Sequence, residues 1–94
     1  MNDPADQNQK LALASRLSLL DAINAALDRR AEVLRVIEDS EDEAEAVAAV
    51  RSMLSVDEVC ARAVLMLQWS RLTRSARARI ADERLDVTRR LDML

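Results

Sequence analysis

Leucines spaced seven positions apart run through the first part of the chain. The repeat consists of Leu13, Leu20, Leu27 and Leu34, and the same stripe is filled in by Leu17, Ile23, Ala31 and Ile37. An apolar side chain every three to four positions predicts an amphipathic helix, and a seven-residue repeat is typical of coiled coils. We therefore predict one helix over about residues 10–38, after a disordered polar tail over residues 1–9. At about 1.5 Å per residue this helix is roughly 40 Å long, which favours a protruding coiled-coil arm.

Helix-start signals divide the rest of the chain into shorter helices. Ser40 with Glu43, and Ser55 with Glu58, have the spacing of a capping box, in which a hydroxyl and a carboxylate satisfy the first free N–H groups of a helix. Thr73 is a suitable N-cap for a last helix. No glycine interrupts the chain, and its single proline lies near the start. The fold class is therefore all-α with about four helices, the last three over residues 41–53, 56–71 and 74–93.

The turns between these helices are short and polar, which favours antiparallel packing of neighbours. The last helix then returns alongside the first as a long antiparallel pair, and the middle helices form a small head, all within one domain over residues 10–94. The helix over 56–71 is apolar on two faces, and a chain this short covers only one of them. We expect a second copy to cover the other face about a two-fold axis. The residues expected at this dimer interface are Val64, Leu65, Gln68, Trp69 and Leu72.

The amino acids that the chain lacks exclude most enzyme chemistry. It has no glycine for a phosphate-binding loop, no histidine as general base or metal ligand, and no tyrosine nucleophile. The one cysteine, Cys60, forms neither an internal disulfide nor a thiolate metal cluster, and its apolar neighbours indicate a buried, unreactive thiol. We therefore predict a protein that is not an enzyme, with no catalytic residues, no metal and no cofactor.

Charge and hydropathy favour a cytoplasmic protein. The acidic start, Met1–Asp6, lacks the basic and apolar regions of a signal peptide. The uncharged stretch Ala63–Ser70 is far shorter than the roughly 20 residues that span a bilayer. We expect no membrane insertion.

Three segments resemble part of a known protein family. They are LSLLDAINAALDRRAEVLRVI (residues 17–37), the capped segment 40–50, and LSVDEVCARAVLMLQWSRLTRSARARI (residues 54–80). Together they resemble the A subunit of DNA gyrase and topoisomerase IV, at the end of its tower helix, the helical head of its exit gate and the start of the returning helix. The third segment keeps in register with the family Glu58, Ala61, Ala63, Leu65, Arg71, Leu72, Thr73, Arg77 and Ile80.

The chain also departs from the family pattern. The winged helix and catalytic tyrosine of the family lie outside the matched region, and Met66, Gln68 and Ala76 replace family residues that are charged. The resemblance therefore implies a helical head and a dimer without strand passage. Its expected function is a non-catalytic coiled-coil dimerisation and interaction protein, whose partner is a second copy, the A subunit of DNA gyrase or another protein.

Two alternatives belong to other functional classes. A nucleic-acid-binding module would use Arg71, Arg74, Arg77 and Arg79 against phosphates, although the net charge of the chain is −3 and acidic residues follow the cluster. A small all-helical chorismate mutase is weakly suggested by INAALDRRAEV (residues 23–33). That family surrounds a dicarboxylate with arginine and lysine, and the only lysine here, Lys10, lies outside the suitable spacing.

Overall fold

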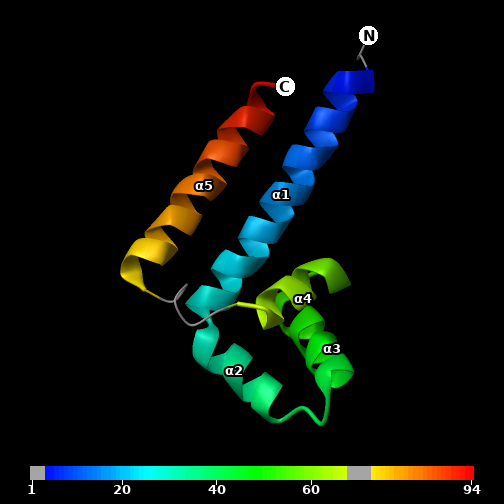
Figure 1. The fold of residues 1–94 in the computed structure, drawn as a ribbon, viewed down its shortest axis with the longest axis vertical. Coiled ribbons are helices and arrows are strands. Elements are labelled where there is room, and N and C mark those ends of the chain that lie inside the picture. The colour runs from blue at the N-terminus through cyan, green and yellow to red at the C-terminus, as the bar shows by residue number, and fades with distance from the viewer. Residues whose placement is uncertain (1–3, 68–72) are drawn as a thin grey trace.

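The structure, a computed structural model, describes residues 4–67 and 73–94, and this part of the chain is helical without strands. The molecule is elongated, with dimensions of 50 × 29 × 16 Å, and α1 and α5 lie antiparallel beside a smaller group of helices (Figure 1). None of the described helices is long and apolar enough to cross a membrane. The described helices are α1 (Pro4–Asp28), α2 (Arg30–Glu38), α3 (Glu43–Leu54), α4 (Glu58–Leu65) and α5 (Arg74–Asp92).

We call the α1–α5 pair the arm. Its core is a seam of large aliphatic side chains, in which α1 places an apolar residue on the facing side every three to four positions and α5 contributes Ile80, Val87 and half-buried Leu91. Two cross-helix ion pairs, Arg16–Glu83 and Asp21–Arg84, connect α1 to α5 and help to set the register of the helices. The buried residues of the seam are Leu13, Leu20, Ile23, Leu27, Ile80 and Val87.

The first predicted helix, over residues 10–38, is two helices in the structure. α1 begins at Pro4, inside the segment that was expected to be a disordered tail, and proline is well suited to the first turn of a helix. The chain bends at Arg29 (φ −115°, ψ 32°) although neither glycine nor proline is present there. The physical reason is packing, since Leu27 is buried in the arm while Val33 must reach the core of the head.

Two guanidinium groups stabilise this bend. The Arg30 side chain donates a hydrogen bond of 2.8 Å to the carbonyl oxygen of Leu27, near the end of α1. The Arg29 side chain donates one of 3.1 Å to the carbonyl oxygen of Met53, in the last turn of α3. Both bonds satisfy carbonyl groups that have no partner inside a helix at its C-terminal end.

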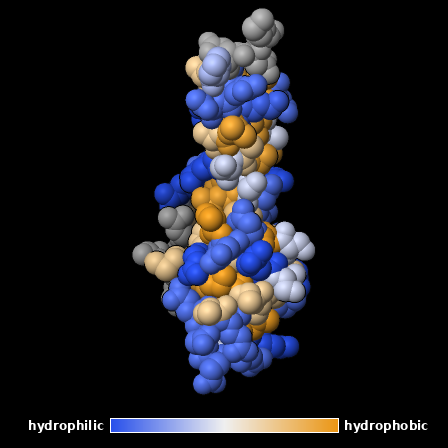
Figure 2. Space-filling view, turned by 90° about the vertical axis from the view of Figure 1, so that its right-hand side faces the viewer, coloured by the Kyte–Doolittle hydropathy of each residue, from blue (hydrophilic) through white to orange (hydrophobic). Residues whose placement is uncertain are grey.

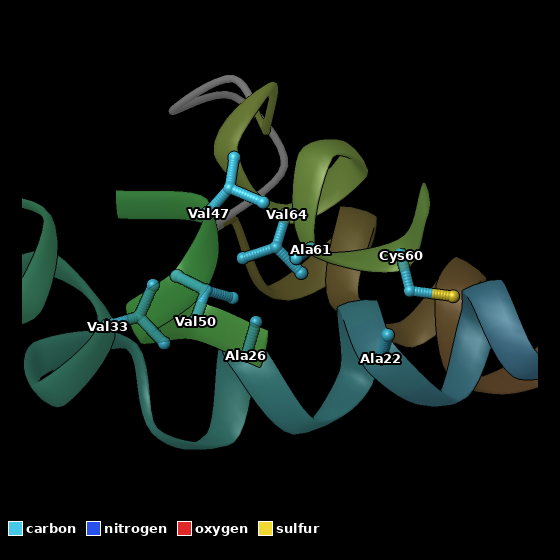
Figure 3. Packing of buried hydrophobic residues seen from close by; sticks show 8 residues of the cluster. All are labelled: Ala22, Ala26, Val33, Val47, Val50, Cys60, Ala61 and Val64. Atoms are coloured by element: carbon cyan, nitrogen blue, oxygen red, sulfur yellow. The ribbon is translucent and has the colours of Figure 1, made fainter. Parts of the chain in front are cut away.

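We call α2, α3 and α4, with the part of α1 that they contact, the head. Alanines on α1 and α4 allow the helices to approach closely around Val50, which is fully buried, and Figure 3 shows these small side chains converging. The head therefore has an aliphatic core of its own, separate from that of the arm. Its buried residues are Ala22, Ala26, Val33, Val47, Val50, Cys60, Ala61 and Val64.

The helix caps of the head differ from the predicted capping boxes. The N-cap residues are Asp42, whose carboxylate accepts a hydrogen bond of 2.9 Å from the N–H of Glu45, and Asp57, which accepts one of 2.8 Å from the N–H of Cys60. Ser40 instead donates its hydroxyl to the carbonyl of Val36, at the end of α2. Ser55 is the left-handed residue that ends α3, with φ 55° and ψ 47°, in a position where glycine is usual.

The predicted last cap is confirmed, but α4 is shorter than the helix predicted over 56–71. The hydroxyl of Thr73 accepts a hydrogen bond of 3.2 Å from the N–H of Ala76, as an N-cap should. α4 ends at Leu65, and residues 68–72 lie outside the described part of the chain. Leu67, beyond the helix end, packs against both the head core and the arm core, so the chain turns where the two cores meet.

Candidate interaction surface

Of the five residues expected at a dimer interface, Val64 and Leu65 lie in the described part of the chain. Val64 is only 3% exposed and lies in the head core with Val47 and Ala61 (Figure 3). Its predicted place at an interface is therefore corrected, because a side chain buried in its own subunit offers almost no surface to a second copy. Leu65 is half-buried against the same core. The remaining predicted interface residues, which lie outside the described part of the chain, are Gln68, Trp69 and Leu72.

The exposed apolar surface of the head lies on another side of α4. Val59 is 74% exposed and Met66 is 77% exposed, and half-buried Ala63 lies between them in sequence. Val59 and Ala63, four positions apart, share one face of α4, and Met66 is the C-cap residue that directly follows the helix. We call these three residues the outer face of α4. Among the described residues of the head, no other large hydrophobic side chain is exposed.

Sequence reasoning missed this surface because a helix that is apolar on two faces does not show which of its side chains are buried. In the structure Cys60 is buried towards α1, whereas Val59, the residue before it, is exposed. The signal that identifies the outer face is the seven-residue spacing of Val59 and Met66, the same spacing that marks the leucines of α1. Figure 2 shows the side of the molecule that carries α3 and α4, where areas of hydrophobic surface lie between charged side chains.

An arginine at the edge of the outer face joins α4 to α3. Arg62 makes ion pairs with Glu58 on its own helix, at 2.8 Å, and with Glu43 at the start of α3, at 3.6 Å. Its hydrogen bond to Glu58 and the charge of that carboxylate raise the pKa of Arg62 above its usual value. The outer face is therefore apolar along its middle and charged along one edge, an arrangement common at interfaces between proteins.

The described arginines of the cluster proposed for nucleic-acid binding do not share one face of α5. Arg74 and Arg77 are three positions apart and share a face of α5, whereas Arg79, two positions after Arg77, points to roughly the opposite side of the helix. Arg71 lies outside the described residues. Arg77 is half-buried, and its Nε is buried without a hydrogen-bond partner in the described part of the chain. This arrangement presents no more than two of the described arginines to one phosphate backbone.

The segment with the weak mutase resemblance, residues 23–33, carries structural roles. Ile23 and Leu27 belong to the arm core and Val33 to the head core. The two arginines of the segment, Arg29 and Arg30, donate hydrogen bonds to backbone carbonyls at the bend. Their guanidinium groups are thus used in holding helix ends together, which speaks against a role in binding a dicarboxylate substrate.

The described residues offer little reactive chemistry. They contain no group of three or more carboxylate or thiol side chains placed to hold a metal ion, and no charged side chain among them is buried. Burial raises the pKa of the Cys60 thiol to about 11, with further contributions from its hydrogen bond to Asp57 and from the charge of that carboxylate. The thiol is therefore protonated at neutral pH, and a protonated thiol is a poor nucleophile.

Comparison with known proteins adds no relative. A scan against protein-family models found no match, and a search of curated proteins found none either.

Proposed function

We propose that this chain is a non-catalytic, gyrase-A-like dimerisation and interaction protein whose head pairs with a second copy about a two-fold axis. The observation that carries the proposal is the outer face of α4, where Val59 and Met66 are exposed while the other large hydrophobic side chains described in the head are buried or half-buried. We infer that these side chains belong to a larger apolar surface that contacts another protein, as extended exposed apolar patches commonly do.

The arrangement of the helices supports the gyrase-like part of the proposal. A long antiparallel pair that carries a small head at the end where the chain turns is the layout implied by the resemblance over residues 17–37, 40–50 and 54–80 (Figure 1). In the proposal the α1–α5 pair acts as a coiled-coil arm. In the proposal the described part of the interface is the outer face of α4 with Leu65, and Gln68, Trp69 and Leu72 stay interface residues predicted from the sequence alone.

The free energy gained by apolar burial in such a dimer is of the same order as the cost of association. Burying one large apolar side chain contributes roughly 1.5–3 kcal/mol, so two copies of Val59 and Met66 contribute about 6–12 kcal/mol. Association costs about 4–15 kcal/mol in lost freedom of motion. The two described side chains therefore meet the lower part of that cost, and further apolar contacts must contribute to a stable dimer.

Sedimentation equilibrium tests the pairing. We expect the wild type to have about twice the chain mass at tens of micromolar, and Met66→Glu to be monomeric with an unchanged helical spectrum, because two copies of the new carboxylate would meet at the interface. Lys10→Glu, a change of charge at an exposed position far along the arm, is the matched control and should stay dimeric. A monomeric wild type, or a folded Met66→Glu variant that remains dimeric, would show that the outer face of α4 is not the interface.

The proposal also names a cellular setting and a partner. The single, unpaired Cys60 is suited to the reducing cytoplasm. A pull-down from cytoplasmic extract, probed for the A subunit of DNA gyrase, tests whether the head binds the corresponding head of gyrase. Recovery of that subunit by the wild type but not by Met66→Glu supports the gyrase-directed role, and equal recovery by both rejects it.

A further inference from the structure

A cavity opens at the junction between the arm and the head. It has a volume of about 400 Å³ and lies where α1 passes the turn between α3 and α4. This size is within the range of small-molecule sites in proteins, roughly 300–1,000 Å³. Figure 3 shows the side chain of Cys60 extending from α4 towards α1. The lining residues are Ser18, Asp21, Ala22, Ala25, Leu54, Ser55, Val56, Asp57 and Cys60.

The lining combines small apolar side chains with two carboxylates. Ala25 and Val56 provide partly exposed apolar surface, and the charged residues that line the cavity in the described part of the chain, Asp21 and Asp57, are both acidic. Asp21 is already paired with Arg84 on α5. Of the two carboxylates in the cavity, Asp21 is therefore neutralised by an arginine of the arm, whereas Asp57 is not part of this pair.

Asp57 keeps a negative charge that forms no ion pair among the described residues, although the charge of Arg51 also helps to lower its pKa. One of its oxygens accepts the N–H of Cys60 at 2.8 Å, and this bond is the largest cause that holds the pKa of Asp57 below its usual value. The carboxylate is therefore ionised at neutral pH. A carboxylate accepts several hydrogen bonds through its two oxygens, so the cap bond leaves acceptor capacity for a ligand.

We propose that this cavity binds an aliphatic cation, with an ammonium or guanidinium group at Asp57 and the carbon chain against Ala25 and Val56. A cation matches the charge of the lining, an aliphatic chain matches its apolar part, and an anion would be repelled by the two carboxylates. The same chemistry occurs in a free polyamine and in a lysine or arginine side chain presented by another protein. This site is independent of dimerisation through the outer face of α4.

NMR titration of the full chain identifies the ligand class. Spermidine stands for the free polyamine and N-acetyl-arginine methylamide for a presented side chain, while pentanoate is an anionic control with a similar carbon chain. We expect at least one of the two cations to shift the amide signals of Ser55, Asp57 and Cys60 in a saturable manner at millimolar concentration. The cation that binds indicates the source, and all titrations are done at a protein concentration with a single oligomeric state.

Three variants make the test specific. Asp57→Asn removes the charge but keeps a side chain that caps α4 well, so the dissociation constant of the cation should rise about three- to tenfold. Ala25→Leu fills the cavity without a change of charge and should weaken binding at least as much. Asp82→Asn removes an exposed carboxylate of α5 outside the cavity and should leave binding unchanged. The proposal is overturned if neither cation binds saturably, if pentanoate binds equally well, or if the folded Asp57→Asn and Ala25→Leu variants bind as the wild type does.

Discussion

Replacing Val50 by alanine should destabilise the protein by about 2–3 kcal/mol. Val50 is 0% exposed and lies in the middle of the head core. The change removes the equivalent of two methylene groups, about 1.6 kcal/mol at roughly 0.8 kcal/mol each, and leaves a void that the surrounding helices fill only in part. A domain of this length has a stability of the order of 5–14 kcal/mol, so the expected loss is a substantial fraction of it.

Urea unfolding followed by circular dichroism at 222 nm measures this loss, at a protein concentration low enough to keep the chain monomeric. The thermal midpoint should fall by roughly 8–24 °C, since a domain of this size loses about 4–8 °C per kcal/mol. The matched control is Val59→Ala, the same substitution at a side chain that is 74% exposed on α4, and it should change the free energy of unfolding by less than about 0.5 kcal/mol. Equal effects of the two substitutions would refute the placement of Val50 inside the core and Val59 outside it.

Three further predictions concern single side chains. Asp57→Ala should lower the urea midpoint at neutral pH because α4 loses its N-cap. Since the folded pKa of Asp57 is depressed, the difference in stability from the wild type should shrink as the pH falls through that pKa. A difference that persists in acid would contradict this cause. The thiol of Cys60 has a raised folded pKa of about 11, so its contribution to stability is complete below the ordinary value of 9.0 and is lost as the pH rises towards 11. Thiolate absorbance at 240 nm and unfolding of Cys60→Ala between these two pH values test this prediction. Arg84→Gln should reduce stability only slightly, and the effect should disappear in high salt because the Asp21–Arg84 pair is about half exposed. A large loss of stability that does not depend on salt would show that Arg84 acts through packing instead.

Little of the candidate surface was predictable from the residues. The doubly apolar character of the segment over 56–71 predicted an interface that did not include Val59 or Met66, the exposed large hydrophobic side chains described in the head. Which side chains these are was not predictable, because the helical pattern contains two apolar faces and does not say which one meets α1. The structure places Cys60, Ala61 and Val64 inside and leaves Val59 and Met66 outside. The dimer and the gyrase relationship remain predictions that the experiments above test.

The sequence by itself determined the helical class, because the absence of glycine, the strong helix formers and the apolar periodicity act locally and need no distant contact. It also specified the pairing of the first and last helices, whose apolar stripes match along the arm. Only the tertiary structure decided the bend at Arg29 and the choice of Asp42 and Asp57 as caps. These features depend on where Val33 and Cys60 must lie to fill the head core. Burial is a property of contacts between distant segments, so local propensity cannot set it in advance.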